Sequence, residues 1–409
     1  HAYQNERMSM QAAEISSDVS ESPASSTWGA VVCMSLLCFV LVSSEFMPVS
    51  LLTPIARDLA ITEGQAGQAI SVSGFFAVIT SLFGNSLLAK LDRRSATLLY
   101  TAIMIASGVA VTFAPNYPLF MLGRALIGVS IGGFWSLSTA IIVRIVAGAD
   151  IPKAIAMLQG GTALAFVVAA PMGSFLGSLI GWRGAFFTVV PLGVAGLLWQ
   201  LAVIPRLPAQ RDVTVRQMLG LLRGRTFALG MAATTLAFMG QFSLSTYLRP
   251  FLEDVTGIGV NTLSLFLFGI GFAGFVGTLL IGFVLRSHLL FALVGLPVGL
   301  ASMAALLILA GQNVILTGIV LLIWGLFTTP IPVAWNTWMT RVIPDDLEAG
   351  GALQVALIQL AITTGAFAGG MLFDSYGWMS TFALAAVLLT ASAIVAMLVG
   401  RPGRRSSKT

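Results

Sequence analysis

The sequence is poor in charged residues, cysteine and histidine. Only 9% of its 409 residues are Asp, Glu, Lys or Arg, whereas a soluble domain carries about 25%. The two cysteines, Cys33 and Cys38, lie in one apolar run, and the two histidines are His1 and His288. Two cysteines in one expected helix supply neither a disulfide framework nor a metal-ligand set. We therefore exclude a soluble globular domain, and we expect no metal site and no cofactor.

Apolar residues are abundant instead: they make up 57% of the chain, and the mean hydropathy is +0.94. A helix that spans a bilayer needs about 20 mostly apolar residues. Twelve such runs are present, and they cover residues 28–53, 66–89, 96–114, 118–143, 154–180, 184–203, 227–248, 261–285, 289–310, 314–340, 350–373 and 379–400. The pattern predicts an all-α protein that crosses the lipid bilayer with twelve transmembrane helices.

Basic residues gather on one side of the expected membrane. With the N-terminus placed in the cytoplasm, the cytoplasmic segments hold 17 of the 21 Lys and Arg residues. The outer loops hold only Arg57, Arg183 and Arg249, and Arg124 lies within a span. Because Lys and Arg accumulate in cytoplasmic loops, both termini are expected in the cytoplasm. The net charge of +5 follows from this asymmetry, and we expect no nucleic-acid partner.

The spans divide into two groups of six. The expected segments are a disordered cytoplasmic tail (1–27), a six-helix bundle (28–203), a central cytoplasmic loop (204–226), a second six-helix bundle (227–400) and a basic cytoplasmic tail (401–409). The tail over 1–27 is rich in Ser and Glu and lacks hydrophobic periodicity, which is typical of disorder. The loop over 204–226 is the longest internal connection and therefore separates the two bundles.

The two bundles repeat each other with a nearly constant offset. Adding 196 takes Glu45 to Gln241 and Phe46 to Phe242. Parallel repeats about an axis along the membrane normal are typical of secondary transporters, which bind substrate near mid-membrane between the repeats. Only the first half keeps an ionisable group at this position, so we interpret the carboxylate as a proton carrier and transport as the leading hypothesis.

Two charged residues lie inside spans at similar depth. Glu45 in "VSSEFMPVS" and Arg124 in "LFMLGRALIG" lie about 12 Å and about 9 Å from the outer ends of their helices. Charges within a membrane usually face the bundle interior, where they pair or line a pathway. One interpretation is a static ion pair. The other, which we favour, is a protonatable carboxylate beside a guanidinium, used for proton coupling.

Helical spacing extends this candidate site. At 100° per residue, Trp135 lies about 20° from the face of Arg124, and Ser138 about 40° from it on the other side. Polar residues expected to line the same cavity from the second half are Gln241, Ser245 and Asn336. An aromatic residue and converging polar groups suit a small amphipathic ligand. Taken one at a time, each residue is explained equally well by a hydrogen bond between helices.

Two motifs of soluble enzymes occur in the wrong context. "GVSIG", residues 128–132, fits a nucleophile elbow but lies in the middle of a span, whereas that motif needs a strand-to-helix turn and a histidine partner. "GIGFAG", residues 269–274, fits a dinucleotide fingerprint but opens no strand–turn–helix unit. Small residues that allow close helix packing explain both, and we do not expect an enzyme.

Three segments carry a family resemblance. "RALIGVSIGG" resembles the R-x-x-x-G motif, with Arg124 and Gly128 in place, and "AAPMGSFLG" resembles the antiporter motif G-P-x-x-G-G, with Pro171 and Gly173 in place. "GNSLLAKLDRRS" is a degenerate form of G-x-L-a-D-R-x-G-R-R, in which Leu88 occupies the acidic position. The residues of this loop that match are Gly84, Arg93 and Arg94. These segments resemble the major facilitator superfamily, specifically its twelve-span drug:proton antiporter group.

That resemblance implies two pseudo-symmetric six-helix bundles, proton coupling through Arg124, and gating or helix packing by the matched glycines, proline and loop arginines. A narrower resemblance covers nearly the whole chain beyond the tail. "EFMPVSLLTPIARDL", "GGFWSLS", "GQFSLSTYLRP" and "PVAWNTWMTR" are similar to bacterial purine ribonucleoside efflux pumps. It implies export of inosine, adenosine, guanosine or purine analogues in exchange for protons, by a monomer in the bacterial inner membrane. Sugar or multidrug efflux is the alternative, followed by a channel or a substrate sensor.

Overall fold

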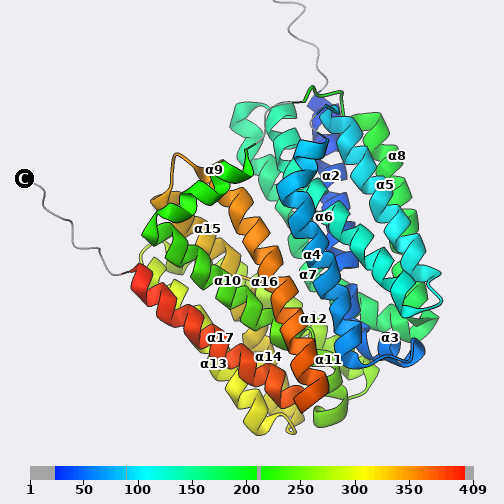
Figure 1. Ribbon diagram of the computed structural model, residues 1–409, viewed down its shortest axis with the longest axis vertical. Helices are drawn as coiled ribbons and strands as arrows, with labels where there is room; N and C mark the ends of the chain where they lie inside the picture. Colours follow the sequence, from blue (N-terminus) through cyan, green and yellow to red (C-terminus); the bar gives the residue numbers. More distant parts are fainter. Residues whose placement is uncertain (1–23, 89, 210–212, 401–409) are drawn as a thin grey trace, which may run out of the picture.

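The computed structural model describes residues 24–88, 90–209 and 213–400, and every regular element within them is a helix (Figure 1). The expected tails lie outside the described residues up to residue 23 and from residue 401, as do residues 210–212 of the expected central loop. The first transmembrane helix begins at Ala24, four residues before the expected start. Most of the other transmembrane helices begin one to three residues before the apolar runs that predicted them.

The described part of the first half contains seven α-helices and a short 3-10 turn. They are α2 (Ala24–Ser50), α3 (Leu52–Asp58), α4 (Glu63–Leu87), α5 (Arg93–Thr112), α6 (Tyr117–Ile145), η1 (Gly148–Asp150), α7 (Ile151–Phe187) and α8 (Val189–Val203). Polar caps start three of them: the side chains of Thr62, Asp92 and Asn116 accept hydrogen bonds from main-chain N–H groups of the first turns of α4, α5 and α6. Such caps satisfy donors that have no partner inside the helix.

The second half follows a short connecting region. Its elements are α9 (Val215–Gly220), η2 (Leu221–Arg223), α10 (Arg225–Ser245), α11 (Leu248–Phe251), η3 (Leu252–Thr256), α12 (Val260–Leu285), α13 (Leu289–Ala310), α14 (Val314–Thr328), α15 (Ile331–Val342), α16 (Leu347–Tyr376) and α17 (Trp378–Val399). The expected span over 314–340 is divided into α14 and α15. Pro330 and Pro332 lie at this division, and proline interrupts a helix because it lacks the N–H group and its ring clashes with the preceding turn.

Eleven helical stretches of the described chain are long and apolar enough to cross a membrane. One of them, Gly148–Val203, has 56 residues, which corresponds to about 84 Å of helix, more than twice the roughly 30 Å of a bilayer core. Gly181 interrupts it with φ 79° and ψ 164°, a conformation that glycine adopts without the cost of a Cβ atom. This stretch therefore holds two of the twelve expected crossings.

The core consists of two separate groups of buried apolar side chains. The larger one is formed almost entirely by residues of the second half, and the other by residues of the first half. Figure 1 shows the same division, with α2 to α8 on one side and α9 to α17 on the other. Two buried residues cross over: Tyr247 of the second half packs in the first-half core, and Ile70 of the first half packs in the second-half core. The arrangement confirms the expected fold class of two six-helix bundles.

The halves meet along two pairs of helices: α4 packs against α16, and α7 packs against α12. Glycine allows the close approach in both pairs. A Cβ atom on Gly271 of α12 would lie 2.6 Å from Cα of Val167 on α7, and one on Gly74 of α4 would clash with the hydroxyl of Thr363 on α16. The start of α2 and the end of α17 lie on the same side of the molecule (Figure 1); we call this side the termini face and the other side the opposite face.

Candidate substrate and proton site between the two halves

Glu45 is the one carboxylate among the described residues that is fully enclosed by the helices. Its side chain is 1% exposed, and its Oε1 atom has no hydrogen-bond partner. The residue lies on α2, three positions before Pro48. A carboxylate at such a place is costly and is rarely kept without a function. The structure thus agrees with the sequence in placing an ionisable group inside the helical bundle.

Arg124 on α6 is also buried, with 0% exposure, but it binds main-chain oxygens. Its Nη1 donates to the carbonyl of Ser44 at 2.8 Å, its Nη2 to the carbonyl of Glu45 at 2.6 Å and its Nε to the carbonyl of Ala69 at 3.3 Å. Hydrogen bonds to the backbone of α2 and α4 thus stand in place of the static ion pair, the interpretation that we did not favour. Glu45 and Arg124 remain neighbours, but these three hydrogen bonds of the guanidinium go to main-chain oxygens and not to the Glu45 carboxylate.

Pro48 explains why α2 offers an oxygen to Arg124. In a regular helix the carbonyl of Ser44 would accept the N–H group four residues later, and proline at that position has none. The guanidinium of Arg124 supplies the missing donor. A buried carbonyl without a partner would cost about 1–3 kcal/mol. The hydrogen bond from Arg124 therefore offsets the destabilisation that Pro48 causes in α2.

Phe46 and Phe242 mark the centre of the molecule. The two residues correspond in the repeat, and their ring centroids are 5.4 Å apart. Two equivalent residues can touch only near the axis that relates the halves. Phe166 of α7 packs on the same Phe46 ring at 5.5 Å. Because Glu45 and Gln241 each precede one of the paired phenylalanines, both polar residues lie next to the pseudo-symmetry axis.

Of the other expected site residues, Gln241 fits the site best. It is half-buried, and its Oε1 atom is buried without a partner. Ser245, one turn later, is also half-buried, and Asn336 on α15 is exposed. Trp135 is half-buried and packs against the first-half core, while Ser138 is buried and donates to the carbonyl of Trp135 at 2.9 Å. No described contact brings Ser138 or Asn336 to Glu45.

Two buried glutamines on α16 were not expected from the sequence. Gln359 is 6% exposed and its Oε1 lacks a partner, and Gln354 is 3% exposed and its Nε2 lacks one. The side chain of Gln359 is close enough to the Glu45 carboxylate to act on it as a hydrogen-bonding neighbour. The signal was present, because polar amides inside the apolar run 350–373 are costly in a membrane and therefore mark candidate functional positions.

The motif glycines and proline serve helix packing. A Cβ atom on Gly128 of α6 would clash with the main-chain oxygen of Ser73 on α4, and one on Gly173 of α7 would lie 2.6 Å from the Ser50 hydroxyl on α2. Gly84 gives room to the Tyr100 hydroxyl, 2.8 Å from where its Cβ would be. Pro171 is buried within α7. Small residues let transmembrane helices approach closely, which explains these motif positions.

The loop arginines Arg93 and Arg94 join segments of the first half. Arg94 Nη2 donates to the carbonyl of Leu201 in the last turn of α8 at 2.6 Å, and the main-chain N–H of Arg93 donates to the carbonyl of Leu207 at 2.9 Å. A cation at a helix C-terminus is favourable because the last carbonyls carry partial negative charge. These described contacts hold α5 against the end of α8; a role in gating stays a prediction.

The opposite face is closed by polar contacts between the halves. Glu253 accepts a hydrogen bond from Thr53 Oγ1 at 2.9 Å, and Arg249 donates to the carbonyl of Ser50. Asp374, near the end of α16, accepts from Thr62 Oγ1 at 2.6 Å and from the main-chain N–H of Gly64 at 3.0 Å. A carboxylate at the N-terminus of α4 is favoured by the helix dipole. Opening of this face requires these contacts to separate.

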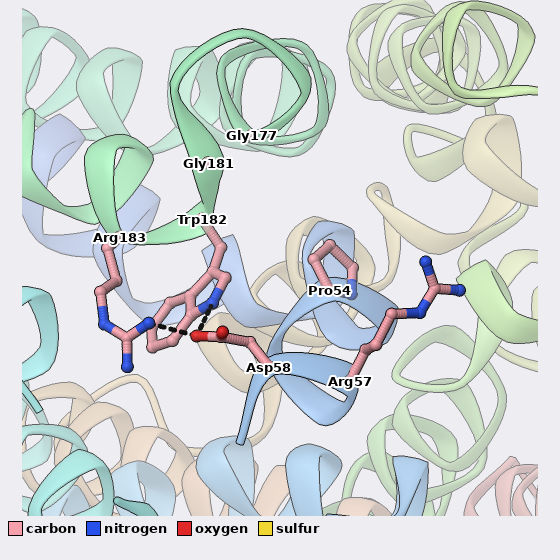
Figure 2. A pocket seen from close by; sticks show the side chains of 7 residues that line it. All are labelled: Pro54, Arg57, Asp58, Gly177, Gly181, Trp182 and Arg183. Carbon is pink, nitrogen blue, oxygen red and sulfur yellow. Dashed lines mark hydrogen bonds and ion pairs between the residues drawn. The ribbon is translucent and has the colours of Figure 1, made fainter. Parts of the chain in front are cut away.

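A separate cavity of about 570 Å³ opens at the opposite face within the first half. It is lined by Pro54, Arg57, Asp58, Gly177, Gly181, Trp182 and Arg183. In Figure 2, Asp58 lies between the side chains of Arg57 and Arg183. Its carboxylate accepts hydrogen bonds from Trp182 Nε1 at 3.0 Å and from Arg183. These contacts fix the break at Gly181 to α3. The cavity does not lie between the halves and is not the candidate site.

Comparison with known proteins now gives the family. The model of the Major Facilitator Superfamily matches residues 32–356. The chain belongs to this superfamily. Its structure is also similar to the crystal structure of a variant of the nucleoside transporter NupG, with a TM-score of 0.73 at 14% identity, covering 91% of this chain and 99% of that one. That likeness shows the fold, and together these findings make the protein a multi-pass membrane transporter.

Two kinds of relatives match nearly the full length. The chain is 48% identical over 381 residues to the "Transcription regulatory protein OpdE" of Pseudomonas aeruginosa, covering 92% of this chain and 95% of the relative. It is 40% identical over 368 residues to the "Purine ribonucleoside efflux pump NepI" of Salmonella enteritidis, covering 90% and 93%. The comparisons therefore confirm that the chain is similar to the superfamily and to the purine ribonucleoside efflux pumps.

Proposed function

We propose that this protein is a proton-coupled antiporter that exports purine ribonucleosides or their analogues across a bacterial inner membrane. The observation that carries the proposal is the enclosed carboxylate of Glu45, 1% exposed and without a partner at Oε1, beside the pseudo-symmetry axis. Proton relays in transporters use intramembrane carboxylates of this kind. The similarity to purine ribonucleoside efflux pumps over 90% of the chain supports the substrate class.

The cycle follows from alternating access between the two halves. In the form open to the outside, Glu45 takes up a proton and the nucleoside departs. In the form open to the cytoplasm, Glu45 releases the proton and a new nucleoside binds. One charge moving through about 150 mV supplies roughly 3.4 kcal/mol, which supports a concentration ratio of a few hundred for an uncharged substrate. A single carboxylate is therefore sufficient for useful export.

The orientation of the cycle rests on the distribution of basic residues. Lys and Arg concentrate in the segments on the termini face, which corresponds to the cytoplasm under the positive-inside rule. The polar contacts of Asp374 and Glu253 between the halves then close the outer side. The structure corresponds, under this assignment, to a form whose outer side is shut.

Everted membrane vesicles test the proposal directly. We expect labelled inosine to accumulate when the lumen is acidic, and a protonophore to collapse that accumulation, because proton exit then drives cargo entry. The measurement is steady-state inosine content with and without an imposed proton gradient. Uptake that persists undiminished in the protonophore contradicts proton antiport. Movement of arabinose or chloramphenicol without any purine would contradict the substrate class instead.

The relative named as a regulatory protein gives a second candidate, a sensor that binds substrate without transporting it. A sensor would bind nucleoside in the same membranes but show neither net flux nor exchange. A channel would show flux that neither saturates nor exchanges. Preloading vesicles with unlabelled inosine separates all three, because only a carrier accelerates the entry of labelled inosine by exchange.

Trp135 is proposed to form part of the cargo wall, as its half-buried ring on α6 offers a face for a purine base. Stacking of a base on an aromatic side chain is worth about 1–3 kcal/mol. We therefore expect Trp135→Ala to raise the KM for inosine roughly tenfold at normal membrane abundance. The matched control is Trp199→Ala on α8, which also packs against the first-half core. An unchanged KM for Trp135→Ala would assign the ring to packing.

A further inference from the structure

Two buried acceptor atoms that lack partners belong to neighbouring side chains from opposite halves. Glu45 Oε1 on α2 and Gln359 Oε1 on α16 are both without a hydrogen bond, and the side chains are 1% and 6% exposed as residues. Gln359 is the neighbouring amide that acts on the Glu45 carboxylate. Unpaired polar atoms at such depth are costly, so their occurrence as neighbours requires an explanation.

Independent contacts place Gln359 beside the Glu45–Arg124 region. The main-chain oxygen of Gln359 lies 3.2 Å from the position that a Cβ atom of Gly74 would take on α4. The preceding residue, Ser73, has its hydroxyl 3.5 Å from Arg124 Nη2, and the same Nη2 binds the carbonyl of Glu45. A continuous set of contacts therefore runs from α16 through α4 and α6 to α2.

Protonation of Glu45 supplies partners for both unpaired oxygen atoms. An ionised carboxylate only accepts hydrogen bonds, and an amide offers two N–H donors and one acceptor oxygen. When Glu45 is ionised, Gln359 can donate to it, but the amide oxygen still lacks a donor. When Glu45 is protonated, its O–H can donate to the amide oxygen while its other oxygen accepts from the amide N–H. The protonated form thus makes two hydrogen bonds where the ionised form makes one.

Arg124 is the charged side chain that acts on Glu45 from the surrounding helices. The other charged side chains described on helices around this site lie near helix ends: Glu63 on α4, Arg93 and Arg94 on α5, Arg144 on α6, Lys153 and Arg183 on α7, Arg225 on α10, Arg249 on α11, and Asp374 on α16. Arg124 belongs to the same half as Glu45, so its contacts do not change when the halves separate. Gln359 belongs to the other half, so its contact with Glu45 does change when the halves separate.

We propose that Glu45 and Gln359 form an acid–amide pair across the interface, so that protonation of Glu45 favours closure of the opposite face. The proposal rests on the proton-antiport function above and names the residue that transmits the protonation state to the second half. It gives the cycle its direction: proton uptake from outside closes the outer side, and proton release in the cytoplasm removes one of the two bonds. Gln359 acts through Glu45 and is a positioning residue.

Gln359→Met tests the pair, because methionine keeps the length of the side chain and removes both hydrogen-bonding groups. Two quantities are measured in everted vesicles: proton-driven accumulation of inosine, and exchange of labelled for unlabelled inosine at equal pH. We expect accumulation to fall roughly five- to tenfold, the effect of one net hydrogen bond on an equilibrium, while exchange stays near the wild-type rate. A merely structural role would lower both together.

The matched control is Gln200→Met. Gln200 on α8 is fully buried, and its amide accepts from Thr101 at 2.8 Å within the first half. We expect this variant to lose thermal stability without changing the ratio of accumulation to exchange. Membrane abundance and the melting temperature of each purified variant show whether a loss of flux comes from misfolding.

Exchanging the two side chains gives a positive test. Glu45→Gln combined with Gln359→Glu restores one carboxyl and one amide across the interface, and we expect it to recover part of the accumulation that Glu45→Gln alone loses. Full accumulation in Gln359→Met overturns the proposed pair, and so does an exchange double variant no better than Glu45→Gln. If wild-type protein shows no proton-dependent accumulation of purines, the antiport function itself fails; if it does and only these variants disagree, the pair alone fails.

Discussion

Glu45→Gln is expected to abolish proton-driven accumulation of inosine while leaving part of the nucleoside exchange. Glutamine keeps the size of the side chain and fixes the site in a form that resembles the protonated one. A full transport cycle needs release and uptake of the proton, whereas exchange only needs the loaded carrier to switch. The expected loss is the whole gradient-dependent component, which amounts to a few hundredfold at about 150 mV. It is measured in vesicles with an acidic lumen.

The same replacement at a different place is the control. Glu63 lies in the first turn of α4 at the opposite face, and Glu63→Gln removes one negative charge without touching the site. We expect it to accumulate inosine like the wild type. Folding of Glu45→Gln should survive because Gln241, its counterpart in the second half, already carries an amide. A stable Glu45→Gln protein that still concentrates inosine with the usual pH dependence would show that the carboxylate is structural.

Arg124→Met is expected to be the most destabilising of these substitutions. It removes the donors to the carbonyls of Ser44, Glu45 and Ala69 and leaves the Glu45 carboxylate without its cationic neighbour. Breaking one member of a buried charged pair costs about 3–5 kcal/mol. We expect low membrane abundance and a large fall in melting temperature. Arg144→Met, on the same helix but half-buried, removes only a hydrogen bond to the carbonyl of Pro208 and is expected to have a small effect.

A double-mutant cycle with Pro48→Ala tests the cause of this loss. Alanine at 48 restores an N–H group that the Ser44 carbonyl can accept within α2. Pro48→Ala should therefore raise stability more in the Arg124→Met background than in the wild type, by about 1 kcal/mol. Comparing the two backgrounds removes the general helix preference of alanine over proline. Equal effects in both would show that the Ser44 carbonyl does not account for the role of Arg124.

Much of the candidate site was predictable from single residues. A carboxylate and a guanidinium inside apolar runs are costly enough to stand out without any structure, and both Glu45 and Arg124 are indeed buried. Gln241 followed from the repeat. The roles of the residues predicted from helical angle stay predictions, because an angle on one helix says nothing of which neighbour covers that face. Ser138 thus turns back to the carbonyl of Trp135, and Asn336 is exposed.

The sequence by itself determined the twelve crossings, the division into two halves, and the repeat that makes Phe46 and Phe242 equivalent. These features depend on local composition and spacing: apolar run length must match the thickness of the bilayer, and a repeat is visible as a constant offset. The family followed from motifs of the same local kind. All of these features can be inferred without knowing which helices contact one another.

Only the tertiary structure decided what the buried charges touch. Arg124 binds the carbonyls that Pro48 leaves open, and Gln359, more than 300 positions along the chain, comes to lie beside Glu45. The contacts of Asp374 with the start of α4 likewise join distant segments. Such pairings depend on how the two bundles pack, because inside a membrane every polar group must find its partner among whichever helices surround it.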